Sequence, residues 1–159
     1  MDLPHNRRTR IRFSVNACGA ERFEGGAPRV RNRLHAMRQA ATAGYRIGLT
    51  IAPILNLPNW REAYDALLVA CANALDGAPG LDLTVELITH RFTEGSRAVL
   101  QGWYPGSGLD MDPAQRSRKL TKFGSAKYVF PRALLAELRA GLEASVARHL
   151  PQARVLYFI

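Results

Sequence analysis

The alternation of strand-like and helix-like segments constrains the fold of this chain more than any other feature of its sequence. The segment 46–52 is mostly apolar, without the regular polar–apolar alternation of a half-exposed strand. Such a run is typical of a strand that is buried on both faces of a parallel sheet. Because repeated strand–helix units connect parallel strands through right-handed crossovers, we predict an α/β chain built on a parallel sheet.

Residue spacing locates the other elements. Strands are expected at 10–16, 46–52, 81–88 and 154–159, and helices at 28–43, 59–75, 96–103 and 131–149. Asn59 and Glu62 have the spacing of a capping box at the start of the second helix. In the last and longest helix, an apolar stripe is interpreted as core packing; it consists of Leu134, Leu135, Leu138, Leu142 and Val146.

Two short segments around Gly124, 120–123 and 127–130, predict a β-hairpin between the third helix and the last. The three strand–helix units before it are too few for a closed eight-stranded barrel, which needs roughly 200 residues or more. We therefore expect one domain over 1–159, which is either an open doubly wound sheet or at most part of a (β/α) barrel. Its first strand begins close to Met1, so we expect the N-terminal portion to lie elsewhere or to be missing; a half barrel would leave an open sheet edge at the first strand.

The chain is strongly basic, with 22 Lys+Arg against 13 Asp+Glu and a formal net charge of +9. Such a charge attracts anionic partners. Within 116–132 there are six positive side chains, three aromatic rings and no acidic residue. Interleaved basic and aromatic side chains suit exposed or distorted nucleic acid, although a solvated surface is the alternative interpretation.

No apolar run is long enough to cross a membrane, and the basic N-terminus is not followed by the apolar segment of a secretory signal. A cytoplasmic location is therefore expected. The two cysteines, Cys18 and Cys71, are too far apart in the sequence to indicate a disulfide framework or a metal site. Both are expected to be small buried thiols.

Ligands of parallel sheets and barrels bind at the carboxyl ends of the strands. The candidate pocket residues at these ends are Ser14, Asn16, Ala52 (through its backbone), Glu86, His90 and Arg91. Glu86 lies within an apolar strand, where a carboxylate is costly unless it is paired, and Arg91 is its candidate partner. For Ser14 and Asn16 a purely structural role at the strand end is equally open, and for His90 the structural role is the preferred interpretation.

At these residues the sequence resembles the spore photoproduct lyase family. The motifs that carry the resemblance are 13–16 (FSVN), 43–45 (AGY), 51–54 (IAPI), 86–92 (ELITHRF), 103–105 (WYP), 122–124 (KFG) with 127–128 (KY), and 156–158 (LYF). They occur in the family's order and spacing, from about Thr9 to Ile159. The motifs at 86–92 and 127–128 make the series specific, because each is unusual and the two are correctly separated.

The resemblance implies a radical S-adenosylmethionine enzyme that repairs a methylene-bridged thymine dimer in DNA. In that family a four-iron four-sulfur cluster reduces S-adenosylmethionine, and the resulting radical abstracts hydrogen from the lesion, which reverts to two thymines. The fold implied is half of a radical S-adenosylmethionine barrel with a C-terminal hairpin that helps to splay the damaged bases. A base that leaves the stack needs such a brace.

Family roles carry over to several positions. By resemblance, Ser14 and the backbone near Ala52 contact S-adenosylmethionine, and Lys122 and Phe123 match the hairpin pair beside the lesion. That pair is arginine and tyrosine in the best-known members, so this chain keeps the charge and the ring but loses the bidentate fork and the hydroxyl. Lys127 and Tyr128 follow the family pattern and join the candidate DNA-binding set without an individual role.

The family's three cluster cysteines (C-x-x-x-C-x-x-C) and its hydrogen-donating cysteine have no counterparts in this sequence. An iron–sulfur cluster requires such thiolates, so we assign no metal ligand and no catalytic residue, and we expect the chain to be inactive alone. Two hypotheses follow. The chain is the C-terminal part of a lyase, with the cluster supplied by an N-terminal half or a partner subunit, or it is a non-catalytic nucleic-acid-binding remnant that uses 116–132.

Overall fold

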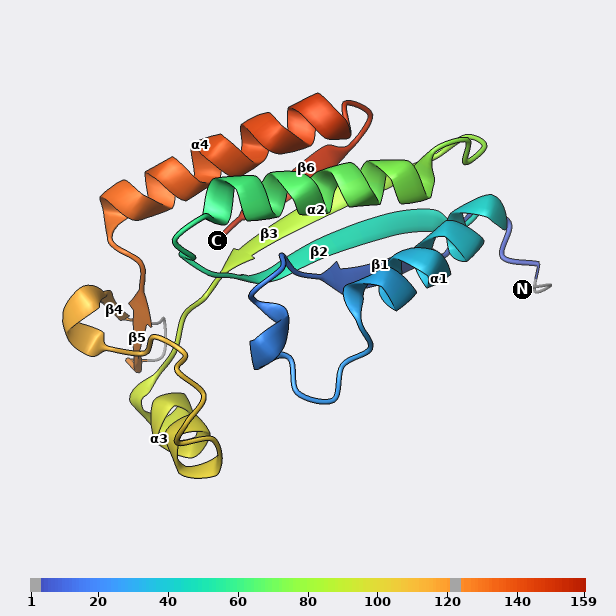
Figure 1. Ribbon diagram of the computed structural model, residues 1–159. Helices are drawn as coiled ribbons and strands as arrows, with labels where there is room; N and C mark the ends of the chain where they lie inside the picture. Colours follow the sequence, from blue (N-terminus) through green and yellow to red (C-terminus); the bar gives the residue numbers. More distant parts are fainter. Residues whose placement is uncertain (1–3, 121–123) are drawn as a thin grey trace.

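A four-stranded, fully parallel sheet forms the centre of the computed structural model, which describes residues 4–120 and 124–159 (Figure 1). The strands are β1 (Arg10–Val15), β2 (Arg46–Ile54), β3 (Leu83–Thr89) and β6 (Arg154–Phe158), in the spatial order β1-β2-β3-β6. Each neighbouring pair is parallel. The predicted parallel sheet and its four strands are confirmed, and β1 lies at an edge of the sheet.

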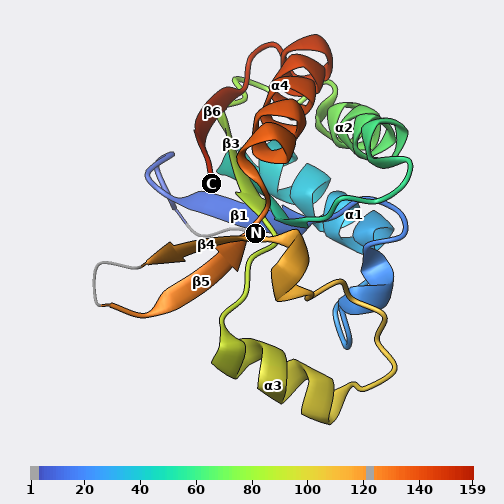
Figure 2. The same cartoon turned by 90° about the vertical axis from the view of Figure 1, so that its left-hand side faces the viewer.

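Three helices cover one face of this sheet (Figures 1 and 2). They are α1 (Val30–Thr42), α2 (Trp60–Leu75) and α4 (Arg132–His149), and α2 packs between the other two. A shorter helix, α3 (Glu94–Trp103), lies apart from them, beyond the carboxyl ends of the strands (Figure 1). Two single-turn 3₁₀ helices, η1 (Glu21–Phe23) and η2 (Pro113–Gln115), lie in the connecting loops.

Side-chain alternation along the strands places the core between the sheet and the helices. This core contains fully buried side chains of β2 (Ile47, Leu49 and Ile51) and of β3 (Val85 and Leu87). The predicted stripe of α4 is confirmed: Leu138, Leu142 and Val146 are buried, and Leu134 and Leu135 are partly buried and pack on the same cluster. Burial of this apolar surface is the main force that holds the helices on the sheet.

The opposite face of the sheet carries polar residues, and no helix of the described ranges packs on it (Figure 2). The register aligns Ser14 with Thr50 and Thr50 with Glu86 across three strands. Helices on one face only, over an open sheet, are the architecture expected for part of a barrel rather than for a doubly wound sheet, which has helices on both faces.

The predicted hairpin is present as a separate two-stranded antiparallel sheet of β4 (Ser117–Leu120) and β5 (Ala126–Val129). It lies beyond the carboxyl ends of the main strands (Figure 1). Its first strand begins three residues earlier than predicted, because Ser117 already pairs with Val129. The expected first arm, 120–123, is therefore wrong at its start, and residues 121–123 lie outside the described residues.

The predicted capping box of α2 is wrong. Asn59 is the N-cap residue, but its side chain makes no capping hydrogen bond, and its backbone (φ −115°, ψ 38°) lacks the extended conformation usual at that position. A capping box forms instead at α3. There the Ser96 amide donates to Thr93 Oγ1 (3.1 Å), and the Thr93 amide donates to Ser96 Oγ (2.9 Å).

The two cysteines differ in their surroundings. Cys71 is fully buried in α2, and burial raises the pKa of its thiol to about 12. Cys18 is exposed, so the expectation of a buried thiol is wrong there, because it lies in the turn that follows β1 rather than in an element that packs on the core. Among the helices that the structure describes, none is long and apolar enough to cross a membrane.

Candidate functional site

An ion pair lies on the open face of the sheet. Arg12 of β1 donates from Nε to Oε1 of Glu86 on β3 over 3.1 Å, and Thr50 of β2 donates from Oγ1 to Oε2 of Glu86 over 2.9 Å. Both carboxylate oxygens therefore have a partner, which a buried carboxylate requires. The Glu86 side chain is only 10% exposed.

Gly48 makes this pair geometrically possible. It lies on β2, opposite Arg12, and a Cβ atom added to it would approach Arg12 Cγ to 2.7 Å. The stem of Arg12 thus passes directly over β2 to reach β3. Sequence analysis missed Arg12 and Thr50. The signal that could have found them is the row of polar residues at every second position of β1, Arg10, Arg12 and Ser14, which marks one face of a strand.

The predicted pairing of Glu86 with Arg91 is wrong. Because β3 ends at Thr89, Arg91 lies beyond the sheet, exposed, and lines a different cavity beside the hairpin and α4. Arg91 was chosen because it is close to Glu86 in the sequence. The parallel pairing of β1, β2 and β3 instead brings Arg12 to Glu86.

Asn16, at the carboxyl end of β1, has a structural role. It is buried, and its Nδ2 donates to the Pro53 carbonyl over 2.9 Å. Its Oδ1 accepts from the Ala17 amide (2.9 Å) and from the Tyr64 hydroxyl (3.2 Å). Asn16 therefore ties the ends of β1 and β2 together. Its place in a ligand pocket stays a prediction.

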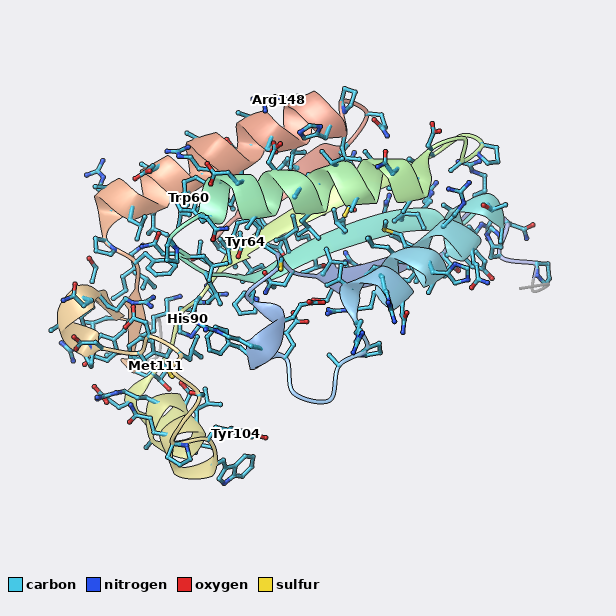
Figure 3. All side chains as sticks on the ribbon, viewed as in Figure 1. Trp60, Tyr64, His90, Tyr104, Met111 and Arg148 are labelled. Atoms are coloured by element: carbon cyan, nitrogen blue, oxygen red, sulfur yellow. The ribbon has the colours of Figure 1, made fainter. Side chains whose placement is uncertain are left out.

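Tyr64 of α2 completes that link (Figure 3). Its hydroxyl also accepts from the Leu55 amide over 2.8 Å, and burial raises its pKa to about 12. A buried tyrosine on the apolar stripe of a helix has no distinguishing signal in the sequence, so its contact with the strand ends could not be predicted.

Ser14 and Ala52 lie at the same edge of the open face. Ser14 is exposed, and its carbonyl accepts from Arg33 Nη1 over 3.0 Å. Ala52 is half-buried and has no register partner on β1 or β3, because the β1 pairing ends at Ile51 and the β3 register shifts between Ile51 and Ile54. An exposed hydroxyl and a backbone segment outside the strand register are thus close to Thr50 and Glu86.

His90 is buried and belongs to a polar cluster built around Arg116. The Arg116 side chain is 2% exposed; it donates to the His90 carbonyl (3.2 Å) and to the carbonyl and Oδ2 of Asp110 (3.0 and 3.1 Å), and its guanidinium lies over the Phe130 ring (4.0 Å). Burial, followed by the charge of Arg116, lowers the pKa of His90 to about 4. His90 is therefore neutral near pH 7.

This cluster corrects the interpretation of the basic segment 116–132. Arg116 is its first cation, but it is buried and joins the loop at Asp110 to the end of β3, so it is not part of a surface for a polyanion. Burial lowers its pKa, while the hydrogen bond and the charge of Asp110 act in the opposite direction. Nothing in the local sequence around Arg116 distinguishes it from the neighbouring cations.

The hairpin presents two different faces. On one face Arg118 is paired with Tyr128, whose ring stacks on Phe92 with centroids 5.2 Å apart. On the other face Lys119 is directly opposite Lys127. The candidate lesion-contacting pair, Lys122 and Phe123, lies outside the described residues.

The donor set does not fit an iron–sulfur cluster. Cys71 is buried in the core and Cys18 is exposed, and together they are the two cysteines of the chain. Over 4–120 and 124–159, no group of three or more His, Cys, Asp or Glu side chains is arranged to hold a metal ion.

Comparisons with known proteins agree on one family. The sequence profile of "Spore photoproduct lyase" matches residues 1–159. The chain is 39% identical to a spore photoproduct lyase of Geobacillus sp. (strain Y412MC61), over 99% of this chain and 47% of the relative. It is 35% identical to that of Bacillus subtilis (strain 168), over 99% of this chain and 46% of the relative.

Solved structures give the same result. A substituted spore photoproduct lyase with bound AdoMet and dinucleoside spore photoproduct superimposes with a TM-score of 0.94 at 37% identity, over 99% of this chain and 47% of the solved one. A spore photoproduct lyase complexed with dinucleoside spore photoproduct has the same TM-score of 0.94 and identity of 37%. The chain spans about half the length of these relatives. It belongs to the spore photoproduct lyase family.

Proposed function

We propose that this chain is the C-terminal half of a radical S-adenosylmethionine lyase that reverts a thymine dimer in DNA to two thymines. One observation carries the proposal: the chain matches, along nearly its whole length, a solved lyase that holds both AdoMet and dinucleoside spore photoproduct. The open polar face of the sheet and the adjacent basic hairpin supply the two kinds of surface that this activity needs.

Ser14 and the backbone at Ala52 are the residues that would hold S-adenosylmethionine. Two observations support this assignment. Ser14 is exposed, and Ala52 has no register partner on β1 or β3. When bound, the cofactor supplies radical chemistry. The Arg12–Glu86 ion pair, in which Glu86 is the buried partner, stiffens the open face of the sheet, because each carboxylate oxygen of Glu86 is held by a different strand.

An iron–sulfur cluster is not part of what this chain binds by itself, since three thiolates are needed and the chain has two cysteines in unrelated places. We propose that an N-terminal half or a partner polypeptide provides it. The hairpin contributes the contact with damaged DNA, with Lys122, Phe123, Lys127 and Tyr128 as the residues on which it depends.

The test combines this chain with a cluster-binding N-terminal half of a relative under anaerobic, reducing conditions. We expect each dinucleoside spore photoproduct to be converted to two thymidines, a conversion measured by chromatography. We also expect Ser14→Ala to lose S-adenosylmethionine affinity. Inactivity of the assembly, together with equal binding of damaged and undamaged oligonucleotides, would contradict the proposal. That outcome would favour the alternative, a nucleic-acid-binding remnant.

A further inference from the structure

A basic cavity of about 450 Å³ lies between the hairpin, the first half of α4 and the carboxyl ends of β3 and β6. Five cationic side chains line it: Arg91, Lys119, Lys127, Arg132 and Arg139. No aspartate or glutamate is among the described residues that line it. Ser14 and Glu86, on the open face of the sheet, are not among the described residues that line this cavity.

The positive charge of this cavity is largely uncompensated. Arg139 forms an ion pair with Glu143 over 2.9 Å, and no ion pair joins the other four cations to a residue within the described ranges. Lys119 and Lys127 are directly opposite each other on β4 and β5. Like charges in that position destabilise a strand pair, so the arrangement costs stability unless an anion lies between them.

The remaining wall is apolar, which makes the charge more effective. Val129, Leu135 and Phe158 contribute to it. Near such surfaces, fixed charges interact more strongly with an anion than they do in water. Thr89 also lines the cavity, but its hydroxyl donates to the Ile159 carbonyl over 2.9 Å. The chemistry that matches several cations over an apolar wall is a phosphate group.

We propose that this cavity binds a phosphodiester of the DNA strand that flanks the lesion; the inference rests on the proposed function. A nucleic-acid strand carries one negative charge per nucleotide, and phosphate contacts fix the position of a strand without reading its sequence. The Lys119–Lys127 face of the hairpin is directed to this cavity, whereas Arg118 and Tyr128 alternate to the other face. One side of the hairpin therefore faces the DNA backbone, while its other side carries Arg118 and Tyr128, whose ring stacks on Phe92.

The experiment compares Lys119→Gln/Arg132→Gln with a matched control, Arg29→Gln/Arg31→Gln, which removes the same charge from exposed arginines at the start of α1. Binding is measured by fluorescence anisotropy, over a salt series, with a single-stranded oligonucleotide of about ten nucleotides that contains the lesion. For the cavity variant we expect about tenfold weaker binding and a log–log salt slope reduced by about 0.7, the value for one phosphate contact on a single strand. The control should retain most of the affinity and the slope.

Dinucleoside spore photoproduct separates this inference from the proposed function, because it has no flanking phosphates. The cavity variant should bind it as wild type does. If the variant and the control bind the oligonucleotide equally while wild type still prefers damaged over undamaged strands, the cavity inference is wrong and the proposed function stands. If that preference is absent but the cavity variant loses affinity, the proposed function is wrong and the phosphodiester site is supported.

A competition experiment with inorganic phosphate distinguishes a DNA phosphodiester from free phosphate as the ligand of the cavity. At constant ionic strength inorganic phosphate should compete with the oligonucleotide only weakly, because a strand gains from several phosphate contacts. Tight binding of inorganic phosphate to wild type, with oligonucleotide affinity unchanged in Lys119→Gln/Arg132→Gln, would overturn the assignment to DNA.

Discussion

Arg12 and Glu86 form an ion pair across the strand that separates them, with Arg12 Nε 3.1 Å from Glu86 Oε1. The pair joins β1 to β3 above Gly48 of β2, on the face of the sheet that carries the candidate cofactor residues. Because the Glu86 side chain is 10% exposed and that of Arg12 is 55% exposed, Arg12 partly shields the carboxylate from water. Because a side chain at position 48 would collide with Arg12, the ion pair on this face depends on Gly48.

Replacement of Gly48 by alanine should break that ion pair. The new Cβ would lie 2.7 Å from Arg12 Cγ, so the arginine must move and Glu86 keeps only its bond from Thr50. We expect a loss of about 1–2 kcal/mol in the free energy of unfolding, measured by urea denaturation. In an Arg12→Ala background the same substitution should cost little, because the clash with Arg12 Cγ is gone and the next side-chain atom, Arg10 Cδ, lies at an ordinary contact distance of 3.5 Å. Equal costs in both backgrounds would show that the clash is not the cause.

Replacement of Arg116 by methionine should destabilise the hairpin side of the molecule. The substitution removes hydrogen bonds to the carbonyls of His90 and Asp110 and the contact with Phe130. We expect a loss of about 2–3 kcal/mol in chemical denaturation. Arg118→Met is the matched control: that side chain is exposed on β4, and its loss should change stability by less than about 0.5 kcal/mol. Similar effects of the two substitutions would argue against the buried cluster.

Stability should fall as the pH decreases from 6.5 to about 4, because of His90. Its pKa in the folded chain is about 4, below the ordinary value of 6.5, so the unfolded chain binds the extra proton in this range. The contribution is thus fully present above pH 6.5 and is lost as the pH falls to about 4, by about 3 kcal/mol. The charge of Arg116 adds to the lowering of this pKa, and the charge of Asp110 opposes it.

Denaturation midpoints across this range, compared with those of His90→Gln, provide the measurement. The variant should lack this dependence. Asp65 and Asp82 do not interfere, because hydrogen bonds lower their pKa values below the ordinary 3.8, and their contributions are lost in more acidic solution. An unchanged pH dependence in the variant would mean that another group titrates.

The contact between α2 and α4 depends on Gly141. A Cβ atom there would approach Trp60 Cη2 to 2.5 Å, so Gly141→Ala should push the helices apart and lower the melting temperature, at a cost of about 1–3 kcal/mol. Gly102→Ala in α3 has nothing within 4 Å of the new atom and should stabilise the chain by up to about 1 kcal/mol. Glycine-to-alanine substitution is thus expected to lower the stability at position 141 and to raise it at position 102. A stabilised Gly141→Ala variant would contradict the packing described.

The sequence alone determined the parallel α/β architecture, the order of its elements and the family. Strands and helices were recognisable because their periods, two and 3.6 residues, are local properties of the chain. The hairpin was recognisable from the short segments around Gly124, although its first strand begins earlier, at Ser117. The family followed from motifs whose order does not depend on folding.

Only the tertiary structure decided which side chains meet. Glu86 pairs with Arg12, which is 74 residues away in the sequence, rather than with the nearby Arg91, because the register of three parallel strands brings the two together. Asn16 meets Tyr64 and Arg116 becomes buried for similar reasons. Strand register and burial arise from packing over the whole chain, so a cation on a surface and a cation inside a polar cluster look the same in the sequence.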